Sequence, residues 1–354
     1  LWINLKIHKK KNETMHQNQS YQKAIMPQYV EALLSCRGKK VCTNLANAMN
    51  TSHDKIYRSF EESITSPNEI PYQLEKLAKK ELNENNTYLL LDDFKISKIY
   101  AHEIEGIEVS YDGSTGLPLL GLTMVNALLT DTNINIPINT KQYVSKELAQ
   151  SSHVTKSEIG IAIAIEIIKR FKIQRLLADA HYASNNSIQS FHEHSINFLM
   201  KIPRHRIVTI NDFTGQLQTI LRLKKNSHTA CKKGLINGME CYFYVVKLSN
   251  NTSAYLISND YIDPYNVYEL YRIRWNIELF HRTSKQYLGI KDCQMRSAEK
   301  QRQHILHVMH AYALASIYKY LFEFECVEDV IKNFRDVKLT ALYAQKSLQK
   351  RTLC

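Results

Sequence analysis

The sequence of 354 residues lacks an apolar run of the roughly 18 to 20 residues that a membrane-spanning helix needs. Its longest apolar stretch, 117–129, is interrupted by Pro118, Gly121 and Asn126, and no signal-peptide core precedes the folded region. The seven cysteines are scattered, odd in number and without a CxxC pair, which argues against a disulfide framework or a zinc ribbon. These absences predict a cytoplasmic protein with reduced thiols and no membrane partner.

Acidic side chains are in deficit: 34 Asp and Glu stand against 46 Lys and Arg, which gives a formal net charge of +12. The isoelectric point is about 9.2. With 44% hydrophobic and 23% charged residues, the composition is otherwise ordinary for a folded protein. This excess of positive charge favours a polyanionic partner, and we expect that partner to be nucleic acid.

The N-terminal part of the chain predicts helices. Residues 1–14 form a Lys-rich extension for which we expect no fold, and residues 15–84 are predicted to be a helical DNA-binding region. Within it, 43–49 and 54–60 fit the two helices of a helix-turn-helix presenting Lys55 and Arg58, although plain packing of two short helices explains them equally well.

The middle of the chain alternates apolar runs with turn residues. This pattern predicts strands at 88–91, 107–111, 119–129, 175–178 and 198–202, the first three as a meander, with a helix at 184–194. The isoleucines of 157–172 alternate as in a strand, but the length of the segment and its alanines favour a buried helix.

The last third changes character twice. Residues 203–263 predict a β-rich insertion with clustered basic residues. From 264 onward we expect helices at 265–289 and 299–323, and then a basic helical tail at 326–354.

Three carboxylates stand out by their positions. Asp92 and Asp179 each close a short apolar strand, and Glu278 lies on the helix expected at 265–289. If they converged, their mutual repulsion would require a divalent cation, and oxygen ligands suit Mg²⁺ or Mn²⁺.

The surroundings of Glu278 are cationic. At about 100° per residue, Tyr271, Arg274, Glu278 and Lys285 share one helix face, with Arg282 beside them, and the opposite face is apolar. A solvated face of ordinary ion pairs would look similar, so the two aspartates carry much of the functional interpretation.

The spacing Tyr271-x2-Arg274-x3-Glu278-x6-Lys285 matches the Y-x2-R-x3-E-x6-K signature of DDE transposases from bacterial insertion sequences. The segments 89–93 and 176–179, the latter followed by Tyr182, resemble the two aspartate strands of that family. The long interval between Asp179 and Glu278 resembles the subgroup with a β-strand insertion, and the resemblance covers about residues 85–325.

The resemblance implies an α/β fold: an RNase H-like mixed five-stranded sheet flanked by helices, formed by 85–202 and 264–325, with 203–263 as the insertion. It also implies that Asp92, Asp179 and Glu278 hold two Mg²⁺ ions, which Mn²⁺ can replace. Asp93 is the alternative first ligand, because the acid is doubled and Phe94 stands where a small hydroxyl residue is expected.

The implied activity is hydrolysis of DNA phosphodiesters at the ends of a mobile element, followed by strand transfer. Tyr271, Arg274, Lys285 and Arg282 would bind DNA phosphates. The implied partners are double-stranded DNA, both terminal inverted repeats and target, and a second subunit in a homodimer on DNA. Bound to DNA, the protein would associate with the bacterial nucleoid.

Other interpretations stay open. The chain could be a catalytically inactive DNA-binding remnant of a transposase, or an RNase H-like nuclease without strand transfer. A glycosidase also uses paired carboxylates, but the net charge of +12 favours a phosphate substrate. We expect Trp275 to be a core residue and His181 to be structural, and we assign no zinc site to the cysteines.

Overall fold

The computed structural model describes residues 19–64, 69–101, 103–112, 116–250 and 252–335. Four helices come first, at α2 (Gln19–Ser35), α3 (Cys42–Ala48), α4 (His53–Ile64) and α5 (Glu69–Glu81). Helices α3 and α4 lie where the helix-turn-helix was predicted. The extension 1–14 and most of the tail 326–354 fall outside the described residues.

A large mixed sheet forms the centre of the molecule. Its first six strands are β1 (Tyr88–Ser97), β2 (Glu108–Asp112), β3 (Leu117–Thr130), β4 (Asn135–Tyr143), β5 (Arg175–Ala178) and β6 (Phe198–Lys201). Strand β1 pairs antiparallel with β3 and parallel with β5, and β5 pairs parallel with β6. Strands β2 and β4 each pair antiparallel with β3.

Two expectations about these strands were wrong. The first three strands do not form a meander, because β1 pairs directly with β3 while β2 lies beyond β3. Strand β1 does not end at its acids but continues to Ser97, since residues 94–96 are buried and pair across to β3. The sequence analysis also missed β4, in which Pro137 separates Ile136 from Ile138 and polar residues follow.

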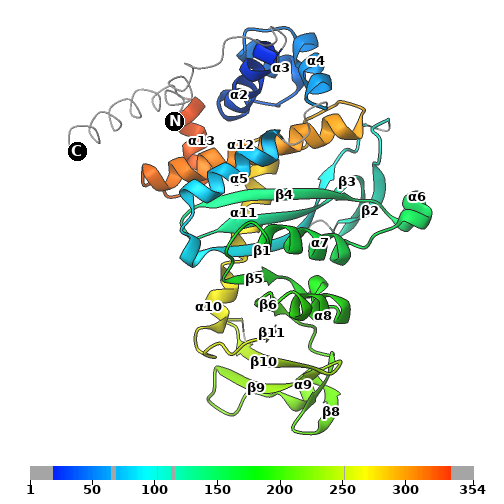
Figure 1. Cartoon of the computed structure of the whole chain (residues 1–354), viewed down its shortest axis with the longest axis vertical. Coiled ribbons are helices and arrows are strands. Elements are labelled where there is room, and N and C mark those ends of the chain that lie inside the picture. Colours follow the sequence, from blue (N-terminus) through cyan, green and yellow to red (C-terminus); the bar gives the residue numbers. More distant parts are fainter. Residues whose placement is uncertain (1–18, 65–68, 102, 113–115, 251, 336–354) are drawn as a thin grey trace, which may run out of the picture.

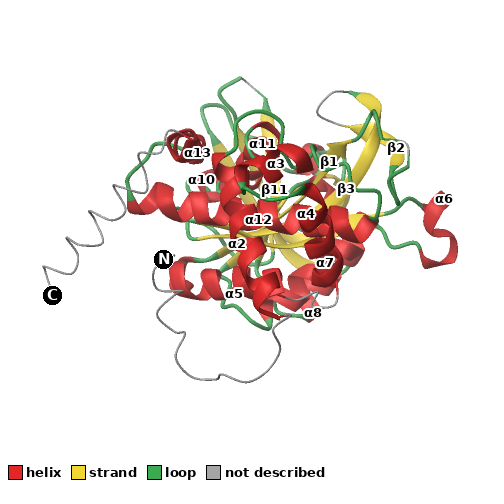
Figure 2. Cartoon of the chain, turned by 90° about the horizontal axis from the view of Figure 1, so that it is seen from above, coloured by secondary structure: helices red, strands yellow, loops and turns green. Residues whose placement is uncertain are grey.

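Helices cover both faces of this sheet, as Figure 2 shows. The predicted central helix is α7 (Lys156–Ile168), and a reciprocal capping box between Thr155 and Glu158 fixes its start. It ends before residue 172 because the N–H groups of Arg170 and Phe171 both turn back to the carbonyl of Ile167. Helix α8 (Asn185–Glu193) follows β5, and α6 (Lys146–Ala149) is one short turn.

The insertion extends the sheet instead of standing apart from it. Its elements are β7 (Ile207–Ile210), β8 (Phe213–Gln216), α9 (Leu217–Ile220), β9 (Thr229–Ile236), β10 (Met239–Lys247) and β11 (Ser253–Ser258). Strand β11 pairs with β6, so the sheet continues without a gap from the central strands into the insertion. Figure 1 shows the insertion at one end of the molecule and α2–α4 at the other.

The C-terminal helices are α10 (Val267–Arg272), α11 (Trp275–Gln286), α12 (Ala298–Leu321) and α13 (Val327–Arg335). The expected single helix over 265–289 is therefore wrong: the chain breaks between α10 and α11. The N–H groups of Ile273 and Arg274 bond to carbonyls three residues back, which tightens the turn and interrupts the α-helical ladder.

Helix α12 joins the N-terminal helices to the sheet. It packs on β4 and α5 on one side and on α2 and α4 on the other. The hydroxyl of Tyr29 on α2 lies 2.8 Å from Nδ1 of His304, and both side chains are buried. Among the described residues no helix is long and apolar enough to cross a membrane.

Candidate active site

The parallel register of β1 and β5 places the two aspartates side by side. Leu91 pairs with Ala178, so the next residues, Asp92 and Asp179, are neighbours on the same face of the sheet. Each carboxylate accepts a hydrogen bond from nearby backbone: Asp92 Oδ1 from the N–H of Asp93 at 3.0 Å, and Asp179 Oδ1 from the N–H of His181 at 2.8 Å. Both side chains are thus oriented by the main chain that follows them.

The doubled acid is divided between the two faces of β1. Because side chains alternate along a strand, Asp93 points to the face opposite Asp92, where α7 packs. There its Oδ2 accepts from Lys156 Nζ at 2.6 Å. Only Asp92 therefore lies on the face that α11 covers.

Arg274 connects Asp92 to Glu278. Its Nη1 lies 3.3 Å from Asp92 Oδ2, and its Nη2 donates to Glu278 Oε1. The side chains of Asp92 and Arg274 are each 15% exposed and that of Glu278 is 31% exposed. One guanidinium thus holds carboxylates from a strand and a helix that are far apart in the chain.

The electrostatics place Asp179 in the neighbourhood of Asp92 and Tyr271. Burial raises the pKa of Asp92 to about 7; Arg274 opposes this rise, and the negative charges of Asp179 and Asp93 add to it. Burial raises the pKa of Tyr271 to about 12; Arg274 again opposes the rise, and the charge of Asp179 adds to it. The charge of Asp179 therefore acts on residues from both β1 and α10.

The predicted DNA-binding residues lie at different distances from these acids. Tyr271 faces the Arg274 guanidinium, whose carbon is 5.8 Å from the ring centroid. Lys285 Nζ lies 5.3 Å from the centroid of the Phe94 ring, two residues beyond Asp92. Arg282 is half exposed and pairs at 3.5 Å with Glu328 at the start of α13. The structure thus groups Tyr271 and Arg274 with the acids. It places Lys285 against Phe94, two residues after Asp92, and it pairs Arg282 with α13.

Sequence reasoning missed two side chains that lie against this site. Asn126 lies on β3 directly opposite Asp92 in the register of β1 and β3. Its Nδ2 donates to Nε2 of His281 on α11 at 3.2 Å. His281 is kept neutral because burial, with the nearby charges of Lys285 and Arg274, lowers its pKa to about 3. Only strand register could have revealed Asn126; the burial pattern of the helix could have indicated His281.

Two aromatic residues near the acids, Trp275 and Tyr182, differ in burial. Trp275 is 55% exposed, so the expectation that it is a core residue was wrong; it is the first residue after the break between α10 and α11. Tyr182 is fully buried, and its hydroxyl has no hydrogen-bond partner in the described part of the chain. The ring fits against Gly160 of α7, where a β-carbon would lie 2.5 Å from Tyr182 Cε1.

The acids fit a divalent cation by donor type. Asp92, Asp179 and Glu278 offer oxygen atoms only, which is the donor type that a hard divalent cation prefers. In the described residues, no three His, Cys, Asp or Glu side chains are already gathered in ligand geometry. The guanidinium of Arg274 instead bridges two of the three acids, Asp92 and Glu278, with its single positive charge.

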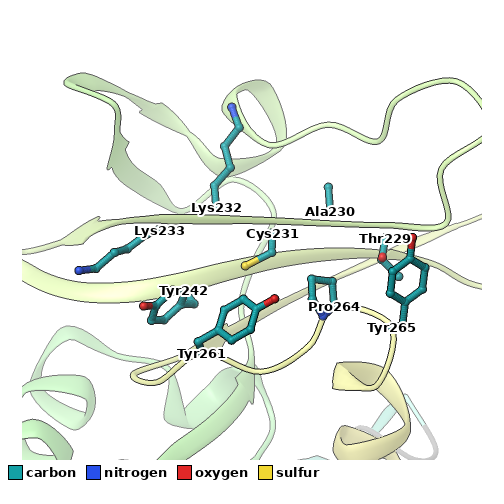
Figure 3. A pocket seen from close by; sticks show the side chains of 9 residues that line it. All are labelled: Thr229, Ala230, Cys231, Lys232, Lys233, Tyr242, Tyr261, Pro264 and Tyr265. Carbon is teal, nitrogen blue, oxygen red and sulfur yellow. The ribbon is translucent and has the colours of Figure 1, made fainter.

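A second feature lies in the insertion, where a hollow of about 460 Å³ opens between β9 and the loop after β11 (Figure 3). Cys231 and Lys233 of β9 lie on the side of Tyr242 and Tyr261, whereas Lys232 points to the opposite face of the strand; Tyr265 lies at the other end of the hollow. The rings of Tyr242 and Tyr261 meet edge to face with centroids 5.6 Å apart, while Tyr261 and Tyr265 are 62% and 81% exposed. Exposed aromatic rings beside lysines are suited to nucleobases and phosphates.

Comparisons with known proteins identify the family of the chain. A family model described as "Transposase DDE domain" matches residues 132–314, and one described as "DDE superfamily endonuclease" matches residues 14–214. Each covers more than half of the sequence, so the chain belongs to the DDE transposase and endonuclease superfamily. The family-level resemblance stated from the sequence is thereby confirmed.

One similar solved structure is that of a piggyBac transposase in a synaptic complex with hairpin DNA. It is 12% identical, with a TM-score of 0.55 over 98% of this chain and 77% of that chain. The likeness concerns the mixed α/β fold. No curated protein sequence matches the chain.

Proposed function

We propose that this protein is a metal-dependent DNA transposase of the bacterial insertion-sequence type, which hydrolyses phosphodiesters at element ends and transfers the freed 3′-hydroxyl to a target strand. The observation that carries the proposal is the shared guanidinium of Arg274, which brings Glu278 of α11 to Asp92 of β1, beside the strand that ends at Asp179. Membership of the DDE superfamily supports the same chemistry.

We further infer that the central sheet is RNase H-like, as the signature around Glu278 implies. The strand order β4-β3-β1-β5-β6 supports this, with β3 antiparallel to its neighbours and β5 and β6 parallel to β1. In this arrangement the first two acids lie side by side on adjacent parallel strands, Asp92 within β1 and Asp179 directly after the end of β5. Residues 85–202 and 264–325 would be the catalytic core, and 203–263 its insertion.

In the proposed site Asp92, Asp179 and Glu278 hold two Mg²⁺ ions, or Mn²⁺ in their place. The ions would supply the positive charge that makes a water or a 3′-hydroxyl nucleophilic and stabilises the departing oxygen. Asp92 is preferred over Asp93 as ligand because Asp93 faces α7 and is paired with Lys156. Tyr271, Arg274, Lys285 and Arg282 are proposed to bind phosphates, for which Arg274 would exchange at least one carboxylate for a phosphate oxygen.

Binding of double-stranded DNA is proposed to use surfaces at both ends of the molecule. Helix α4 exposes Lys55 and Arg58 in the proposed DNA-binding region 15–84, and the insertion offers the lysine and tyrosine hollow. Terminal inverted repeats and target DNA would be the ligands, held by a homodimer in the bacterial cytoplasm. The net charge of +12 supports a polyanionic partner.

Replacement of Glu278 by glutamine tests the proposal directly. With end DNA and Mg²⁺, we expect Glu278→Gln to reduce strand nicking at least about 100-fold, because an amide is a far weaker ligand for a hard cation than a carboxylate. Glu269→Gln on α10 is the matched control, since Glu269 is exposed and pairs with Arg272 at the surface. Unimpaired nicking by Glu278→Gln would refute the assignment.

Two further outcomes separate the alternatives. A wild-type chain that binds end DNA but never nicks it is an inactive remnant. A chain that nicks but cannot join a pre-cut 3′-hydroxyl end to target DNA is a nuclease without strand transfer.

A further inference from the structure

Phe94 is the one residue near the first acid that departs from the expected pattern, since a small hydroxyl residue was expected there. It lies on the same face of β1 as Asp92 and is 7% exposed. Its ring stacks on His281 with centroids 4.2 Å apart and an interplanar angle of 17°. On the same ring lies the ammonium of Lys285, 5.3 Å from the centroid.

We propose that Phe94 is a positioning residue that sets the place of the Lys285 ammonium and the seating of α11 relative to Asp92. Lys285 follows His281 by four residues and Glu278 by seven, so these three side chains occupy successive turns along one side of the helix. Because Phe94 contacts both His281 and Lys285, it fixes the position of α11 along the helix axis and its rotation about that axis. Phe94 thereby links the first acid's strand to the helix that carries the third.

The contacts around His281 fix the orientation of its imidazole ring. Asn126, opposite Asp92 on β3, donates to Nε2 of His281, which therefore accepts and leaves the ring proton on Nδ1. The imidazole is held in its plane by Asn126 on one side and by the Phe94 ring on its face. A small hydroxyl residue at position 94 would leave both His281 and Lys285 without this surface.

The chemistry of the contact suits a phosphate-binding lysine. An aromatic face attracts an ammonium group without neutralising it, whereas a carboxylate would compete with a phosphate for the same charge. Phe94 can therefore hold Lys285 without itself neutralising the charge of the ammonium group. The part of this inference that concerns DNA rests on the proposed function.

The first test is a double-mutant cycle on binding of end DNA. We expect Phe94→Leu to weaken binding roughly 3- to 10-fold and to reduce the slope of log K against log salt by up to about one unit, as Lys285→Met does. The double variant should bind no more weakly than Lys285→Met alone, because both changes disable the same cation. Phe191→Leu, which removes a fully buried ring on α8 that packs against Phe198 of β6, is the control for a general loss of packing.

The second test needs no DNA. After reductive ¹³C-methylation of the lysines, the proton signal of the Lys285 methyl groups, assigned by its loss in Lys285→Arg, is expected upfield of the other lysines because it lies over an aromatic face. It should return to the ordinary position in Phe94→Leu and stay shifted in Phe191→Leu.

The outcomes distinguish this inference from the proposed function. An unshifted Lys285 signal, additive losses in the cycle, or an equal effect of Phe191→Leu would overturn the role of Phe94. Absence of end-DNA binding or nicking by the wild-type protein would overturn the proposed function, and the methyl signal would then decide the Phe94 contact by itself.

Discussion

Replacing Arg274 by methionine removes the guanidinium that Asp92 and Glu278 share and keeps most of the aliphatic length. Breaking a buried ion pair by deleting one partner costs about 3 to 5 kcal/mol. The cost here should be lower, because Glu278 is 31% exposed and can rehydrate, and Asp92, with a pKa of about 7, can take up a proton. We expect a loss of about 2 to 3 kcal/mol in the free energy of unfolding.

The measurement is urea unfolding near neutral pH with a chelator present. Arg272→Met is the matched control: Arg272 lies two residues away, is 64% exposed and pairs with the exposed Glu269. It should cost less than about 0.5 kcal/mol. If Arg274→Met were as stable as Arg272→Met, the guanidinium would not be the charge that balances these acids.

Mg²⁺ supplies the second half of the experiment. A ligand at 100 times its Kd stabilises the folded state by about 2.7 kcal/mol, so Mg²⁺ should recover much of what Arg274→Met loses. The wild-type protein should gain less from the same addition, because its carboxylates are already engaged by Arg274. Equal stabilisation of both proteins, or of neither, would refute competition between the guanidinium and a cation.

Three further results are expected. Burial raises the folded-state pKa of Asp92 from 3.8 to about 7. This group therefore favours folding below pH 4, and its contribution to the free energy of unfolding is lost as the pH rises through 7, a decline of roughly 3 to 4 kcal/mol. Metal-free Asp92→Asn should lack this decline, which is measured by comparing urea unfolding of the two proteins across pH. Gly160→Ala should cost about 1 to 3 kcal/mol in thermal unfolding because the added carbon meets the Tyr182 ring, and an unchanged melting temperature would contradict that packing. Tyr261→Ser with Tyr265→Ser should leave stability within about 0.5 kcal/mol yet weaken end-DNA binding at least about 5-fold by fluorescence anisotropy; unchanged binding would remove the insertion hollow from the DNA path.

The parts of the site that follow from local sequence could be predicted. A short apolar run closed by an acid predicted β5 with Asp179 at its end, and the helical pattern around Glu278 predicted α11, although not its separation from α10. The central helix was predicted in spite of its alternating isoleucines, because the length of the segment and the alanines between the isoleucines favour a helix. Its buried side holds Gly160 and Ala164 together with Ile159, Ile163 and Ile167, as helical spacing requires.

The parts that depend on tertiary pairing could not be predicted. Nothing local separates Asp92 from Asp93; the choice depends on which face of β1 receives α11, and hence on the register with β3 and β5. The break before Arg274 could not be predicted either, because the hydrophobic pattern of a helix continues through Ile273. The backbone N–H groups there nevertheless bond to carbonyls three residues back instead of four. Both features decide how close Glu278 comes to the sheet.

The two adjacent acids of β1 also differ in how firmly their cations are held. Lys156 follows directly on the capping box at Thr155, so the partner of Asp93 stands on a helix start that is fixed by two reciprocal hydrogen bonds. Arg274 stands at the break between α10 and α11, where the hydrogen-bond pattern of the α-helix is interrupted. Fewer helical hydrogen bonds therefore oppose a change in the direction of the Arg274 side chain than would do so inside a continuous helix. A phosphate group near this break would offer the guanidinium a new anionic partner and free the carboxylates of Asp92 and Glu278. DNA that takes Arg274 away from the acids must then strengthen their affinity for a divalent cation, and by thermodynamic reciprocity a bound cation must strengthen the affinity of Arg274 for DNA.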